Sequence, residues 1–274
     1  MHLVARDMIT GACHIIRPLS AAEIKFDREA APIYFEASNR LGLFTILKEN
    51  YNAWCQSIQE HLSPGKNVMP KHRELDRLMF NFLAAAYGIV EHFETSYRRR
   101  FKKNSSKLQE YKDFVSHLCK NSWAVAFFLD FRNYVQHVEL PIGHISRSEQ
   151  RNSVSISVTQ DAGKLLKASN RWPHSKLSAD KGTIDLISLT DDFYITFVRN
   201  YGDLVARTFY PELKKIDSFF RQLTLEVRSH HPNTTMGYLL DDKHIHTATA
   251  LTTTTTYSER PNFVFEELGI SVKQ

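Results

Sequence analysis

The stretch from Phe131 to His137, FRNYVQH, places three polar side chains at the end of a mostly apolar run: Arg132, Asn133 and His137. Histidine titrates near neutral pH and can therefore act as a general base or a general acid. Arginine stays charged and offers a planar fork of donors to phosphate oxygens. These residue types suit cleavage of RNA, which carries its own nucleophile in the 2′-hydroxyl and needs a base, an acid and a cation near the phosphate.

The spacing of these residues on a helix leaves two interpretations open. At about 100° per residue, Asn133 and His137 lie close to Asp130 on the helical wheel, whereas Arg132 lies on roughly the opposite side. Either the helix leaves the core here and becomes solvated, or its end lines a polar cleft. A histidine at a helix C-terminus is also favoured by the helix dipole alone, and an arginine there can serve an ion pair. One arginine–histidine pair at this spacing is what chance predicts, so the context has to decide.

In context, these residues resemble the hallmark of the HEPN superfamily (higher eukaryote and prokaryote nucleotide-binding domains). Its members are all-helical domains with an arginine, usually a polar residue after it, and a histidine a few residues later. Arg132, Asn133 and His137 match that motif, and LMFNFLAAAYGIVEHFETSYRRRF before it is similar to the long helix of the family. The resemblance covers roughly residues 70 to 140, and the helices after residue 184 would complete the bundle.

The resemblance implies a metal-independent endoribonuclease without a cofactor, acting as a toxin or an anti-phage defence effector. It implies a homodimer in which the motif helices of two copies face each other and build one composite site. His137 would be the general acid or base, Arg132 would bind the scissile phosphate, and Asn133 would orient the imidazole or contact RNA. An antitoxin or another regulatory partner would be expected. The alternative is a non-catalytic HEPN-like module for dimerisation or for binding nucleotides or partners.

Hydrophobic periodicity predicts a mainly all-α fold. A capping box at Ser20 and Glu23 opens the first helix, and a break or restart is expected near Pro32. Pro211 suits a first helical position, so a new helix is expected there. The expected helices span residues 20–60, 72–101, 107–120, 123–140, 184–209 and 211–228.

The chain is predicted to have three parts. Residues 1–69 form an N-terminal helical extension, and residues 70–230 form the HEPN-like helical bundle. A minor β and loop insertion at about 145–182 interrupts this bundle, because SVSISVT at 153–159 alternates like a strand and residues 168–182 resemble a loop. Residues 231–274 form a Thr-rich C-terminal tail. We expect its stretch at 247–261 to be mobile or loosely packed, with a short strand at 262–268.

A second candidate surface is the basic run YRRRFKK. Tyr97 and Phe101 are interleaved among its cations, so the run could bind an RNA backbone and stack a base, although such a run is more often a solvated helix end. The RNA-binding candidates in it are Arg98, Arg99, Arg100, Lys102 and Lys103. DDKHIH at 241–246 holds two histidines, but two ligands on a tail make a poor site, and no metal is expected.

Composition sets broad limits on the class of protein. The formal net charge of +5 permits an anionic partner without requiring one. The 3 cysteines are far apart in the sequence and form no CxxC pair, which favours free thiols over a disulfide framework or a zinc knuckle. The start of the chain lacks the pattern of a signal peptide, and the apolar runs are shorter than the ~20 residues that span a bilayer. We therefore expect a cytoplasmic protein that does not enter the membrane.

Overall fold

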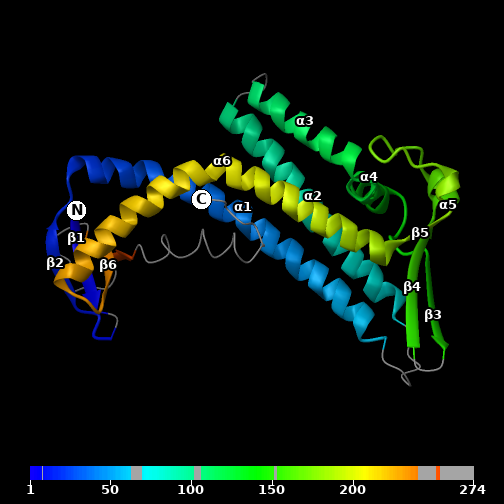
Figure 1. The fold of residues 1–274 in the computed structure, drawn as a ribbon, viewed down its shortest axis with the longest axis horizontal. Helices are drawn as coiled ribbons and strands as arrows, with labels where there is room; N and C mark the ends of the chain where they lie inside the picture. Colours follow the sequence, from blue (N-terminus) through cyan, green and yellow to red (C-terminus); the bar gives the residue numbers. More distant parts are fainter. Residues whose placement is uncertain (8, 63–69, 102–105, 151–152, 240–250, 254–274) are drawn as a thin grey trace. The chain divides into compact units, whose positions relative to one another are not determined.

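The computed structural model describes residues 1–7, 9–62, 70–101, 106–150, 153–239 and 251–253. This part of the chain is mostly helical, with two small antiparallel sheets (Figure 1). The mainly-α class predicted from the sequence is confirmed, whereas the HEPN-like arrangement stays a prediction. The helices are α1 (Ala21–Gln59), α2 (His72–Phe101), α3 (Ser106–Asn121), α4 (Trp123–His137), α5 (Ala162–Ala168), the 3-10 turn η1 (Ala179–Lys181) and α6 (Leu186–His230).

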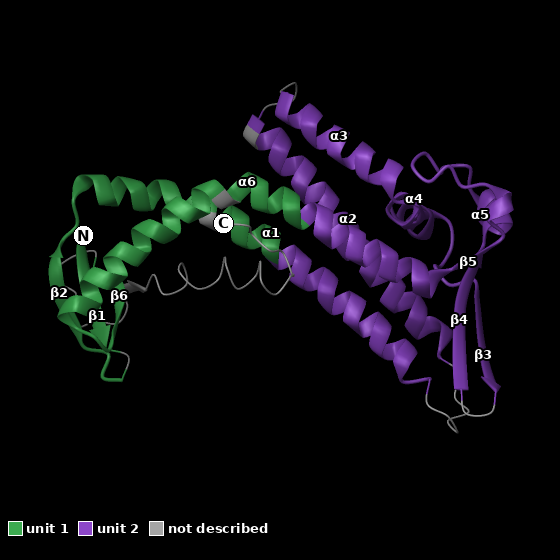
Figure 2. Cartoon of the chain, in the orientation of Figure 1, with its two compact units in different colours: residues 1–41, 202–274 green, residues 42–201 purple. Residues whose placement is uncertain are grey.

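The chain divides into two compact units (Figure 2). One comprises residues 1–41 and 202–274, and the other comprises residues 42–201. Helices α1 and α6 each supply residues to both units. The second unit contains α2, α3, α4 and the whole 141–185 region, so every element that positions the predicted motif belongs to it.

The core of the 42–201 unit is aromatic. Phe82 of α2, Phe128 of α4 and Phe193 of α6 are fully buried and meet edge to face, with ring centroids 5.1 to 6.1 Å apart. Edge-to-face pairs of this kind add to the free energy gained by burying the rings. They fix the apolar face of α4 against α2 and α6, and this leaves the polar end of α4 to face outward.

The two long helices differ from the prediction at their prolines. The expected break near Pro32 is wrong, because α1 runs without interruption from Ala21 to Gln59. The expected pair of helices at 184–209 and 211–228 is also wrong, because Pro211 lies inside the single helix α6. An interior proline costs about 3 kcal/mol. The buried stripe of Phe209, Leu213 and Ile216 continues across Pro211 at helical spacing, and its packing offsets that cost.

The strands form two sheets, one in each unit. In the 42–201 unit the order is β3-β4-β5, which confirms the strand expected at 153–159. In the other unit the order is β2-β1-β6-β7, and none of its strands is predicted by the sequence pattern. The bounds are β1 (His2–Asp7), β2 (Cys13–Pro18), β3 (His144–Gln150), β4 (Ser153–Asp161), β5 (Thr183–Asp185), β6 (Thr234–Leu239) and β7 (Leu251–Thr253).

Some of the segments singled out in the sequence fall on residues that the structure does not describe. The expected strand at 262–268 and the DDKHIH segment lie outside the described ranges, as do Lys102 and Lys103. Of the Thr-rich stretch at 247–261, only residues 251–253 are described, and they form β7 beside β6. Within the described ranges, no helix combines enough length and apolar character to cross a bilayer.

An arginine in β2 joins strand and helix in the first unit. The Arg17 guanidinium donates to both carboxylate oxygens of Glu23 in α1 and to both of Glu226 in α6. Ser20 and Glu23 also exchange the two bonds of the predicted capping box, at 2.7 and 3.2 Å. The bonds from Arg17, followed by those from Ser20, lower the pKa of Glu23 from 4.5 to about 2.

We expect Arg17→Met to flatten the acid dependence of stability. A carboxylate whose pKa is depressed on folding stabilises the protein above its unfolded pKa, and this stabilisation disappears as the pH falls. For Glu23 the decrease runs from about 4.5 down to about 2. Thermal melts at pH 6, 4 and 3 should therefore show a smaller drop in Tm for the variant than for the wild type.

The matched control for this experiment is Lys25→Met, because the Lys25–Glu29 pair is long, at 3.9 Å, and exposed. It should keep the acid dependence of the wild type. Equal pH profiles for Arg17→Met and the wild type would show that the Arg17 ion pairs contribute nothing to the acid dependence.

Candidate active site

Helix α4 carries the predicted motif, and both of its ends follow from local sequence. The Ser122 side chain caps the first turn by accepting from the Val125 amide at 3.3 Å. At the other end Val138 is the C-cap, and its N–H donates to the Tyr134 carbonyl at 2.8 Å. The helix therefore ends at His137, three residues before the predicted end at Leu140. Pro141 disfavours helical geometry in the residue that precedes it.

The chain after α4 is fixed by buried polar groups. The carboxylate of Asp76 in α2, which is 5% exposed, accepts from the Ile142 amide at 3.0 Å. The Gln160 side chain in β4 donates to the Pro141 carbonyl at 2.6 Å. A Cβ at Gly143 would lie 2.7 Å from the Gln160 side-chain oxygen, so only glycine fits there without a shift. These interactions hold the end of α4 and therefore the position of His137.

Asp130 ties α4 to the loop that follows α5. Its carboxylate is fully buried and accepts from the amide of His174 at 3.0 Å and from the amide of Ser175 at 2.8 Å. The Ser175 hydroxyl donates to the same carboxylate at 2.8 Å. A buried charge is stable only when donors of this kind surround it. The loop at 169–178 is thereby held against the motif helix.

Trp172 holds the same loop through packing. Its ring is 5% exposed and lies 5.7 Å from the ring of Tyr134 and 5.9 Å from that of Phe127, both in α4. Its indole N–H donates to the Ser169 carbonyl at 2.9 Å. The Tyr134 hydroxyl donates to Glu139 at 2.9 Å, and burial raises the pKa of Tyr134 to about 12, so it stays a donor at neutral pH.

A groove of about 1110 Å³ runs between the end of α4 and this loop. Asn133 and His137 of the predicted motif line it, and both side chains are exposed. Lys167 of α5 and Arg171 and Lys176 of the loop supply positive charge, and no carboxylate lines the groove in the described part of the chain. The groove therefore presents two lysines, one arginine and one histidine, which suits an anionic ligand.

Arg132 lies in different surroundings from His137. Its guanidinium stacks on the ring of Tyr87 in α2, with the guanidinium carbon 3.7 Å from the ring centroid, and donates to the Asn133 side-chain oxygen at 3.1 Å. Its Nε–H is buried and has no hydrogen-bond partner in the described structure. Arg132 does not line the groove as described. The structure therefore brings Arg132 to Asn133, and Asn133 to the same groove as His137, but does not bring Arg132 to His137.

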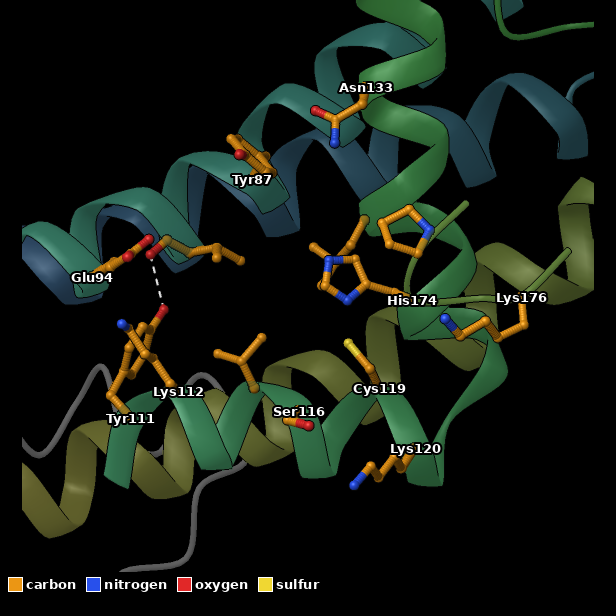
Figure 3. Close-up of a pocket in the computed structure, with 14 residues that line it drawn as sticks. Tyr87, Glu94, Tyr111, Lys112, Ser116, Cys119, Lys120, Asn133, His174 and Lys176 are labelled. Atoms are coloured by element: carbon orange, nitrogen blue, oxygen red, sulfur yellow. Dashed lines mark hydrogen bonds between the residues drawn. The ribbon is translucent and has the colours of Figure 1, made fainter. Parts of the chain in front are cut away.

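A second space of about 430 Å³ adjoins the groove, because Asn133, Pro173 and Lys176 line both. It lies between α2, α3, α4 and the loop (Figure 3). Figure 3 shows the Asn133 amide reaching toward it from α4, with the Tyr87 ring on the α2 side and the Cys119 sulfur on the α3 side. Burial raises the pKa of the Cys119 thiol to about 11, so the thiol stays protonated at neutral pH. No feature of the sequence predicts this cavity.

The basic run at the end of α2 is described only in part. Arg98 pairs with Glu94, and Arg99 is exposed. The side chain of Arg100 is not described. Tyr97 is 8% exposed and stacks on Tyr111 at 5.0 Å. Its ring is therefore not available to stack a base, whereas RNA contact by the cations stays a prediction.

Histidine, cysteine and carboxylate side chains do not gather in groups of three or more that could hold a metal ion anywhere in the described ranges. Cys13, Cys55 and Cys119 are all free thiols. Comparison with protein-family models, with curated proteins and with solved structures finds no match for this chain. A function is therefore inferred from the residues of the motif and from the groove that they line.

Proposed function

We propose that this protein is an endoribonuclease that cleaves RNA without a metal ion. The 2′-oxygen of one nucleotide attacks the neighbouring phosphorus, and the bond from phosphorus to the 5′-oxygen breaks. One product ends in a 2′,3′-cyclic phosphate and the other begins with a 5′-hydroxyl. A base removes the proton of the 2′-hydroxyl, an acid gives a proton to the 5′-oxygen, and cations stabilise the charge on the phosphate.

The observation that carries the proposal is the position of His137 in a groove with three cations. An RNA backbone passing Lys167, Arg171 and Lys176 would bring a phosphate to the exposed imidazole at the end of α4. Histidine changes charge near neutral pH, so it can serve in either proton transfer. Asn133 lines the same groove and offers an amide to the phosphate or the ribose.

The proposal includes a second copy of the chain. Arg132 and His137 are five residues apart, which separates them by about 140° around α4. Two motif helices facing each other would place the arginine of one copy near the histidine of the other. One of the two histidines would then act as the general base and the other as the general acid. Leu140, close to His137 in the chain, is 58% exposed, so a second copy could cover it without filling the groove.

We expect Lys167→Glu to weaken RNA binding on the order of tenfold at low salt, because each lysine that binds a phosphate releases bound counterions. The slope of log affinity against log salt should also become shallower, by about one unit for each phosphate that the protein no longer neutralises. Fluorescence anisotropy with a labelled single-stranded RNA measures both quantities.

The control for this prediction is Lys164→Glu, since Lys164 lies in the same short helix but does not line the groove. It should bind RNA nearly as tightly as the wild type. If the two variants show the same decrease in affinity, binding reflects overall charge, and the groove is not the RNA-binding surface.

Incubation of total RNA with the purified full chain in EDTA tests the activity itself. Cleavage under these conditions is the expected result. Intact RNA after prolonged incubation, tRNA included, would favour the alternative of a non-catalytic binding module. A role as a toxin or an anti-phage effector stays a prediction of the resemblance, since no described residue bears on it.

A further inference from the structure

The 430 Å³ cavity beside the groove has the composition of a ligand site. Its size falls in the range of small-molecule pockets, which are mostly apolar with a few polar groups. Val90, Val115, Leu129 and Cys119 supply apolar surface, and the rings of Tyr87 and Tyr111 border it. The Tyr111 hydroxyl donates to the Val90 carbonyl at 2.9 Å, so this wall of the cavity is fixed in place.

Polar groups in the cavity and at its rim indicate what kind of ligand it takes. Lys112, Lys120 and Lys176 are exposed lysines among the lining residues, and Glu94 is the one carboxylate among them in the described part of the chain. Lysines outnumber carboxylates by three to one, which favours a ligand that carries negative charge. Asn133 and Ser116 add neutral hydrogen-bonding groups. A flat, partly polar body attached to an anionic backbone fits this combination.

Continuity with the groove decides between ligands. Asn133, Pro173 and Lys176 line both spaces, so a strand whose phosphate lies at His137 has direct access to the cavity. We infer that the cavity binds one nucleobase of the RNA next to the scissile phosphate. Lys112 and Lys120 in α3 then meet the phosphate that follows this base. The inference rests on the proposed function and adds a structural cause for a preference in cleavage position.

The cavity also assigns a role to Arg132 that depends on one copy alone. Arg132 stacks on Tyr87, a cavity residue, and donates to Asn133, which lines both spaces. The arginine therefore fixes the orientation of two groups between which the base would pass. In this role it is a positioning residue for the base, in addition to any interaction with phosphate in the composite site.

The experiment uses full-length His137→Ala, which keeps the RNA intact while binding is measured. A set of RNA oligonucleotides, each with one abasic nucleotide, is titrated by fluorescence anisotropy in EDTA. Removing the base that enters the cavity should lower affinity by about tenfold, because a bound base contributes on that scale. Abasic nucleotides at most other positions should have small effects. Equal affinities for the whole series would overturn the inference.

A substitution that fills the cavity tests the same inference in a second way. Val115 is half-buried and lines the cavity from α3. Val115→Trp should bind intact RNA about tenfold more weakly and should no longer respond to the abasic nucleotide, because the indole occupies the space of the base. The matched control Val115→Ala leaves the space open and should respond like the parent. A Val115→Trp variant that keeps the full response would contradict the inference, and the abasic series remains decisive if this variant does not fold.

The outcomes separate the two proposals. If the protein binds and cuts RNA but all the abasic oligonucleotides bind with equal affinity, the base-binding cavity is ruled out and the proposed ribonuclease activity stands. If neither the wild type nor any variant binds RNA, both the proposed function and the base-binding cavity are ruled out. Tight binding of a free mononucleotide, with no added affinity for longer RNA, would make the cavity a small-molecule site and would also overturn the inference.

Discussion

His137→Ala should lower the rate of RNA cleavage by about 10²- to 10⁴-fold, which is the usual contribution of a general acid or base. Among the described residues that line the groove, the imidazole is the group suited to proton transfer near neutral pH. Its side chain is exposed, so truncation removes no buried packing and should leave Tm within about one degree of the wild type. Single-turnover cleavage of a labelled RNA measures the rate.

A second histidine provides the control for His137. His144 is also exposed, but it begins β3 and does not line the groove. His144→Ala should cleave at the wild-type rate. Cleavage that is unchanged in His137→Ala would show that the imidazole takes no part in the reaction. Equal decreases in both variants would indicate a general effect on charge or on folding.

Asp130→Ala should lower the free energy of unfolding by about 3 kcal/mol, because it leaves the donors of His174 and Ser175 without their buried acceptor. Three groups donate to this fully buried carboxylate. The loop that they hold carries Arg171 and Lys176, so the variant should also bind RNA more weakly. Urea denaturation followed by circular dichroism measures the decrease in stability.

Two comparisons make this prediction specific. Asp130→Asn keeps one oxygen as an acceptor and should be destabilised less than Asp130→Ala. Asp192→Ala alters an exposed carboxylate in α6 and should fall within about 0.5 kcal/mol of the wild type. An Asp130→Ala variant as stable as Asp192→Ala would mean that the buried carboxylate does not hold the loop.

The bounds of α2 and α3 and the start of α4 could be predicted because their signals are local, whereas α5 has no such signal and was not predicted. The sequence predicts a helix at 72–101, and α2 has those bounds. Ser122 and Pro141 mark the start and the approximate end of α4. The unbroken α6 could not be predicted in the same way, because a proline signal is local whereas the buried stripe that overrides it depends on tertiary packing.

The β2-β1-β6-β7 sheet could not be predicted from the sequence for a related reason. Leu3, Val4 and Ala5, in the middle of β1, are all fully buried, and β1 lies between β2 and β6 in the sheet. Three consecutive buried residues break the alternation of apolar and polar residues that identifies a half-buried strand. Its pairing partner β6 lies near the other end of the described chain, and no local pattern points to it.

The candidate site also has one part that the sequence predicts and another part that depends on tertiary packing. The motif could be found from the sequence because its residues share one turn and a half of helix. The opposite wall could not, since Lys167, Arg171 and Lys176 belong to a segment whose sequence indicates an insertion with a loop. The sequence also gives no indication of the role of Asp130, because its partners, two backbone amides and the Ser175 hydroxyl, are 44 and 45 residues away. Trp172 and Leu177, two large apolar residues in a mostly polar loop, are the signs in the sequence that this loop packs against the core.

Analysis of the ends of the RNA fragments made in EDTA tests the central claim most directly. The account predicts fragments with 2′,3′-cyclic phosphate and 5′-hydroxyl ends from the wild type, and about 10²- to 10⁴-fold fewer in the same time from His137→Ala. This result would establish attack by the 2′-hydroxyl without a metal ion and would place the reaction at His137. Fragments with 3′-hydroxyl and 5′-phosphate ends, or cyclic ends made equally well by the variant, would contradict it.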